Sequence, residues 1–169
     1  MTHLKRKWRA LVLLAAISLW ALPAAAQTYN PLQPADVQRA LEASGMTGIK
    51  IDKSEDAGEG DYVNAIYRGV NFWVHFTACD DDHTNCEVIV FDASFGYNEN
   101  ATRPTIEQIN DWNEYKLGKA GIADNGNPWI NIEVNTVGGI SHENLDDTIG
   151  WWKRMLEEFA EATNWTWPS

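Results

Sequence analysis

The residues that come closest to a catalytic motif lie between His142 and Asp146, in the run His-Glu-Asn-Leu-Asp. In zinc hydrolases, two histidines one helical turn apart hold the metal and the glutamate between them activates water. Here Asp146 takes the place of the second histidine. Ser141 precedes the run as a typical helix N-cap, and acidic residues favour the first turn of a helix. The run therefore indicates the start of a helix rather than a metal site.

A second acidic group, Asp80 to Asp82 followed by His83, offers oxygen ligands to a hard cation. Calcium loops, however, space their ligands at alternate positions around a glycine, and this pattern is missing here. We expect a solvated acidic loop tip, whose charge also protects the neighbouring strands from edge-to-edge association.

Nucleophilic catalysis finds little support in the sequence, which contains no nucleophile elbow and no Gly-rich phosphate loop. After residue 26 the histidines are His75, His83 and His142. Catalysis would require these three to converge on acidic or hydroxyl groups in one pocket. We predict a non-enzymatic protein with no catalytic residue, no metal site and no cofactor.

The charge of the chain restricts its partners. The full sequence has 13 basic and 24 acidic residues, a formal net charge of −11. Residues 1–26 contain four of the basic residues and no acidic residue, which leaves nine basic and 24 acidic residues and a charge of −15 for residues 27–169. Such a charge excludes electrostatic binding to nucleic acid or to anionic lipid.

The N-terminus has the three parts of a secretory signal peptide. Basic residues from Lys5 to Arg9 are followed by an apolar run, Ala10 to Leu22, and by Pro23-Ala-Ala-Ala26 as a cleavage site. The apolar run is shorter than the roughly 20 residues that a membrane anchor requires. We predict residues 1–26 as a signal peptide and residues 27–169 as one exported domain, periplasmic or secreted, with no membrane attachment after cleavage.

Export gives a meaning to the two cysteines, Cys79 and Cys86, because exported proteins fold in an oxidising compartment. In the strand before Cys79, Val70, Phe72, Val74, Phe76 and Ala78 share one face. In the strand after Cys86, the core positions are Ile89, Phe91, Ala93 and Phe95. Both cysteines then lie on the side away from the core, where a disulfide would join neighbouring strands. The alternative is a pair of buried free thiols.

The remaining patterns predict an α+β fold, an antiparallel β-sheet meander with helices packed on one face. Pro34 and Gly45 bound a first helix, and a capping box at Thr105 opens a second whose stripe is Ile106, Ile109 and Trp112. The last helix has apolar residues at steps of 4, 3, 4 and 3, which makes it the main cover of the sheet. Short strands are predicted near 49–52, 62–67, 70–79, 86–95, 119–123 and 129–135, and residues 27–33 form a polar lead-in.

One face of the predicted sheet mixes aromatic and polar side chains. Trp73 and His75 alternate with the core residues of one strand, and Trp129 and Asn131 do so in another. This composition is typical of a protein interface or of a surface that stacks sugar rings. Alternatively, a loop or helix of the chain covers these residues. We predict Trp73, His75, Trp129 and Asn131 as an interaction surface.

The ordered set of motifs resembles the YbjN family. The resemblance rests on five segments spread over residues 33–161: Phe76-Thr-Ala-Cys79, Cys86, Ile109-Asn-Asp-Trp-Asn113, Lys119-Ala-Gly-Ile122 with Asp124-Asn-Gly126, and Val137-Gly-Gly-Ile-Ser141. It implies a fold similar to class I type III secretion chaperones, which are commonly dimeric and bind protein segments. It implies no catalytic residues.

These observations predict a non-enzymatic, exported YbjN-domain protein, a periplasmic protein-binding or chaperone-like regulatory module. Its expected partner is another protein or a second copy of itself in a homodimer. The alternative is a small-ligand module that stacks glycan rings on Trp73 and Trp129.

Overall fold

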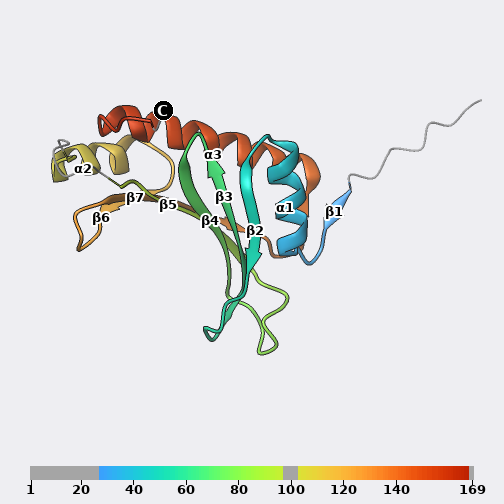
Figure 1. The fold of residues 1–169 in the computed structure, drawn as a ribbon. Coiled ribbons are helices and arrows are strands. Elements are labelled where there is room, and N and C mark those ends of the chain that lie inside the picture. Colours follow the sequence, from blue (N-terminus) through green and yellow to red (C-terminus); the bar gives the residue numbers. More distant parts are fainter. Residues whose placement is uncertain (1–26, 97–102, 168–169) are drawn as a thin grey trace, which may run out of the picture.

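The computed structural model describes residues 27–96 and 103–167 of the 169-residue chain. The predicted signal peptide lies outside these residues. Within them the protein has an α+β fold with three helices on a six-stranded antiparallel sheet, as the sequence predicts (Figure 1). No described helix is both long enough and apolar enough to cross a membrane.

The sheet has the strand order β2-β3-β4-β5-β7-β6, a four-stranded meander extended by a hairpin whose second strand lies inside. Every pairing is antiparallel. A two-residue turn, Arg68-Gly69 with positive φ at both residues, joins β3 to β4, as expected for a type I′ hairpin. The strands are β2 (Thr47–Asp52), β3 (Glu59–Tyr67), β4 (Val70–Thr77), β5 (Val88–Ser94), β6 (Lys119–Ile122) and β7 (Pro128–Asn135).

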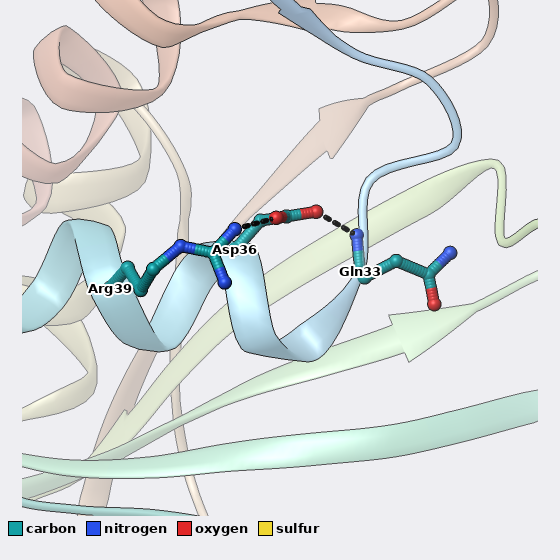
Figure 2. Close-up of polar contacts among 3 residues, drawn as sticks. All are labelled: Gln33, Asp36 and Arg39. Atoms are coloured by element: carbon teal, nitrogen blue, oxygen red, sulfur yellow. Dashed lines mark hydrogen bonds and ion pairs between the residues drawn. The ribbon is translucent and has the colours of Figure 1, made fainter.

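The three helices are α1 (Pro34–Ala43), α2 (Ile106–Tyr115) and α3 (His142–Ala162). At the start of α1 the Gln33 backbone N–H donates to Asp36 Oδ2 at 2.9 Å, and Arg39 pairs with the same carboxylate (Figure 2). Asp36 thus satisfies a backbone donor and places negative charge near the helix N-terminus. The predicted caps of the other two helices are confirmed, because Thr105 and Ser141 each accept a backbone N–H.

Helix α3 covers the sheet through the stripe that the sequence predicts. Its five predicted apolar residues are fully buried: Leu145, Ile149, Trp152, Leu156 and Phe159. Trp152 contacts two sheet residues, Phe72 at 5.8 Å and Phe91 at 5.6 Å between ring centroids. Figure 1 shows α3 running along the same side of the sheet as α1. The main core therefore lies between this helix and one face of the sheet.

The disulfide between Cys79 and Cys86 is present, with an S–S distance of 2.04 Å. Its predicted orientation is wrong. Strand β4 ends at Thr77, and Ala78 has a φ of 53° and is exposed rather than part of the core face. This left-handed residue interrupts the two-residue alternation before Cys79, which packs against the core. Cys86 lies outside β5, directly after the left-handed Asn85, and is part of the core. The disulfide closes the 79–86 loop on the core side.

Three smaller expectations are also corrected. Ile106 is 62 % exposed and is not part of the buried stripe of α2, which consists of Ile109 and Trp112. Strand β3 begins at Glu59, three residues before the predicted strand at 62–67. The polar lead-in contains a short strand, β1 (Thr28–Tyr29), which pairs with β8 (Ile140–Ser141). Two-residue strands carry no periodic signal, which is why the sequence pattern missed them.

Candidate functional site

The face of the sheet directed away from the helices forms the candidate site, here called the open face. One row of directly paired residues crosses all six strands of this face: Lys50, Asn64, Trp73, Asp92, Asn131 and Lys119. In β4, Trp73 and His75 are half-buried, whereas Phe72, Val74 and Phe76 on the other face are at most 1 % exposed. No described helix lies over the open face (Figure 1). The two end residues of the row are exposed, and the four between them are half-buried.

Charges at the two ends of the row are paired within the protein. At one end, Lys50 Nζ lies 2.9 Å from Asp52 Oδ2, which also accepts a hydrogen bond from Asn64 at 3.1 Å. These two donors hold the pKa of Asp52 below its usual range. At the other end, Lys119 Nζ lies 2.8 Å from Glu133 Oε1. The outer parts of the open face are therefore electrostatically neutralised.

The centre of the row differs, because Asp92 lacks a hydrogen-bonded or ion-paired partner among residues 27–96 and 103–167. Asp92 faces Trp73 on one side and Asn131 on the other. Burial raises the pKa of its carboxyl group, and the nearby His75 only partly opposes this effect. A desolvated carboxylate without a counter-ion is thus placed in the middle of an aromatic and polar surface.

The neighbours of Asp92 are acceptors and aromatic rings. The Asn131 Oδ1 atom is buried and has no donor within the described part of the chain. The His75 ring stacks on Tyr62, with 5.5 Å between ring centroids. The structure therefore brings three of the four predicted surface residues, Trp73, His75 and Asn131, around one carboxylate.

Trp129, the fourth predicted residue, lies apart from this cluster. It pairs with Ser94 in β5 and with Gly121 in β6. It therefore lies two strands away from Trp73 and is displaced from it by two residues along the strand direction. Standard strand spacings place the two Trp Cα atoms about 12 Å apart. A Cβ atom at Gly121 would lie 2.5 Å from Cζ2 of Trp129, so the Trp129 ring covers this glycine at the sheet edge. The two Trp rings do not form one continuous stacking platform.

The three histidines considered for catalysis occupy different places. His75 lies on the open face against Tyr62, His83 contacts the backbone of Glu59, and His142 stacks on Tyr29 beside α3. A cavity of about 380 Å³ next to the 79–86 loop is lined by His83 but by neither of the other two. Among the described residues, no group of three His, Cys, Asp or Glu side chains is arranged to hold a metal ion.

The tail residues Trp165 and Trp167 dock on the fold. The Trp165 indole N–H donates to the Gly96 carbonyl at 2.8 Å, and its ring packs on Phe95. Trp167 contacts Tyr67 edge-to-face and accepts the Arg68 guanidinium over its ring at 4.4 Å. Both contacts lie away from the open-face cluster.

A second surface was missed by sequence reasoning. The C-terminal end of α2 and the middle of α3 form a groove lined by Tyr115, Leu117 and Trp151, which are 73 %, 59 % and 41 % exposed. Charged side chains also line it: Lys116, Arg154 and Glu158. Its cavity measures about 240 Å³. Two helices far apart in the sequence create this groove, so no local pattern signals it.

Asp92 was also missed, although the sequence contained a signal for it. It alternates with the predicted core residues Phe91 and Ala93, so strand parity alone places it on the face of Trp73. Strand parity could not reveal that Asp92 is unpaired. Which carboxylates Lys50 and Lys119 pair with depends on the order of the strands in the sheet, and parity does not give that order.

A comparison with protein families places the chain. The family model YbjN, described as "Putative bacterial sensory transduction regulator", matches residues 33–164. The chain belongs to the YbjN family. No curated protein and no solved structure matches this YbjN protein. The expected likeness to class I type III secretion chaperones therefore stays a prediction, whereas the α+β fold is established.

Proposed function

We propose that this YbjN protein is a non-catalytic, exported protein-binding module, chaperone-like or regulatory, that holds its partner on the open face. The observation that carries the proposal is the row across the sheet, with Trp73 and the unpaired Asp92 at its centre. Aromatic side chains beside polar groups are the usual composition of protein interfaces. The family's description as a regulator agrees with a binding role.

Export is supported by two independent features. Residues 1–26 have the composition of a signal peptide. Cys79 and Cys86 form a disulfide, a bond that persists in oxidising compartments such as the periplasm. The partner is therefore expected to be a periplasmic or secreted protein, or a second copy of this chain.

A glycan-binding function receives less support from the geometry. A sugar stacked on both Trp73 and Trp129 would have to bridge about 12 Å between their Cα atoms. The Trp129 ring is moreover directed to the sheet edge over Gly121. Trp73 alone remains available, which is a smaller platform than the sequence suggested.

The proposal is tested by capturing partners from the exported fraction with the wild-type protein and with a Trp73→Ala/Trp129→Ala double variant. Trp151→Ala, which removes an exposed Trp on α3, serves as the matched control. We expect the double variant to lose specific partners that both the wild type and the control retain. An identical partner list for all three proteins would remove the open face from consideration. Sedimentation of the same samples tests whether the captured partner is a second copy.

A further inference from the structure

This inference rests on the proposed function and names the chemistry of the partner. We propose that the centre of the open face binds a cationic side chain, Arg or Lys, of a basic partner segment. In this arrangement Asp92 is the counter-ion and Trp73 is the aromatic wall of the site.

The first argument is the distribution of charge on the open face. The two lysines of the row lie on β2 and β6, which do not border β5, and each is already paired, Lys50 with Asp52 and Lys119 with Glu133. Within residues 27–96 and 103–167, His75 is the titratable side chain that acts electrostatically on Asp92. No lysine or arginine of the described residues reaches the Asp92 carboxylate. The site therefore has an anion without a permanent cation.

The second argument is the kind of group around Asp92. Trp73, directly opposite in β4, presents an indole ring, the side chain that attracts cations most strongly through its π face. Asn131, directly opposite in β7, contributes an oxygen that has no donor and that adds negative potential from inside the protein. Tyr62 adds a second ring next to His75. A carboxylate, an amide oxygen and aromatic faces together favour a cation over an anion or a neutral sugar.

The third argument is the cost of Asp92 to the isolated protein. Its burial raises the pKa of the carboxyl group, which means that the charged form is less stable in the fold than in water. Among the described residues His75 opposes this effect, and it does so only in part. A half-buried charged group without a structural partner is a candidate functional site, and a bound cation would supply an ion pair.

The overall charge supports a basic partner over longer range. The chain has a formal charge of −11, or −15 without the predicted signal peptide. Acidic surfaces attract cationic segments and increase their rate of association. An extended segment directs alternate side chains to one side, so Arg at every second position can present several guanidinium groups to the sheet.

The test uses two blocked decapeptides, one of alternating Arg and Ser and one with Glu in place of Arg. Binding to the purified protein is measured by calorimetry at pH 8, where histidine side chains in general are uncharged. We expect the Arg peptide to bind and the Glu peptide not to bind. Asp92→Asn should weaken Arg-peptide binding about tenfold or more, and Trp73→Ala by about three- to thirtyfold, with partial rescue in Trp73→Phe.

Asp81→Asn is the matched control, because Asp81 is an exposed residue of the 79–86 loop and the substitution changes the net charge equally. It should leave binding within about twofold of wild type. Equal loss in Asp81→Asn and Asp92→Asn would overturn the inference, since binding would then depend on net charge alone. If Asp92→Asn binds like wild type while Trp73→Ala/Trp129→Ala still loses its natural partners, the inference fails and the proposed function stands.

Discussion

The two faces of the sheet are built from the same strands and differ in almost every physical respect. On the helix-covered face, Phe72, Phe91 and Ile130 are fully buried and pack under α3. On the open face, Trp73, Asp92 and Asn131 alternate with them, half-buried and polar. One face removes apolar surface from water and holds the fold together. The other retains the half-buried Asp92 carboxylate, whose charged form is disfavoured by burial, and it is the face on which we propose that a partner binds.

The largest expected effect is on the free energy of unfolding, and it comes from the residues that pack between α3 and the sheet. Trp152→Ala removes the ring that packs between Phe72 and Phe91, and it should lower the free energy of unfolding by about 3–5 kcal/mol. Trp151→Ala, one residue earlier on the exposed side of α3, should cost less than about 1 kcal/mol. Urea denaturation measures both. Similar losses for the two variants would mean that α3 does not supply the core as described.

The disulfide also distinguishes the two faces. It closes the 79–86 loop on the core side, so its removal should affect stability and not binding. Replacing both cysteines, Cys79→Ser and Cys86→Ser, should lower the free energy of unfolding by about 2–3 kcal/mol, mainly by freeing the unfolded chain. Binding of the Arg peptide should be unchanged, since neither cysteine lies on the open face. Loss of binding without loss of stability would place the loop in the site. Intact mass and a free-thiol assay check that the wild type is oxidised.

The smallest expected effect is on the pH dependence of stability, to which Asp92 and Asp80 contribute with opposite signs. Because burial raises the pKa of Asp92, its contribution to stability is present at low pH and is lost as the pH rises from about 4 through the raised value. Hydrogen bonds, chiefly from Asn85, lower the pKa of Asp80 to about 2. Its contribution is therefore present above about pH 4 and is lost as the pH falls toward 2.

Melting temperatures of two variants test these signs. At pH 7, Asp92→Asn should melt slightly above the wild type and Asp80→Asn slightly below it. Both differences should shrink in strong acid, where the two carboxylates of the wild type become protonated. An Asp92→Asn variant that melts below the wild type at pH 7 would show that the carboxylate stabilises the fold through a partner within the chain.

The sequence predicted most of the fold because the decisive signals were local. The regular spacing from Leu145 to Phe159 identified the covering helix, and the alternation from Val70 to Phe76 identified a half-buried strand. The pattern failed where positive backbone angles broke the alternation. Ala78, directly before Cys79, and Asn85, directly before Cys86, both have positive φ, and an alanine does not announce such a conformation.

The candidate site was predictable only in part. Strand parity placed Trp73, His75, Trp129 and Asn131 on one face, which the structure agrees with. Parity could not show that Trp129 lies two strands from Trp73, because β7 lies inside the β6–β7 hairpin and pairs with β5. The groove at Tyr115, Leu117 and Trp151 depends on helix packing across more than 30 positions of sequence and had no local signal.

The most direct test of the account maps the bound Arg peptide on the ¹⁵N-labelled protein by NMR. The open face and the α2–α3 groove are the two competing surfaces, and each contains Trp side chains, Trp73 in the first and Trp112 and Trp151 in the second. We predict the largest shifts at the amides of Trp73, Asp92 and Asn131 and at the Trp73 indole. Shifts concentrated at Trp112, Tyr115 and Trp151 would contradict the account and assign binding to the groove.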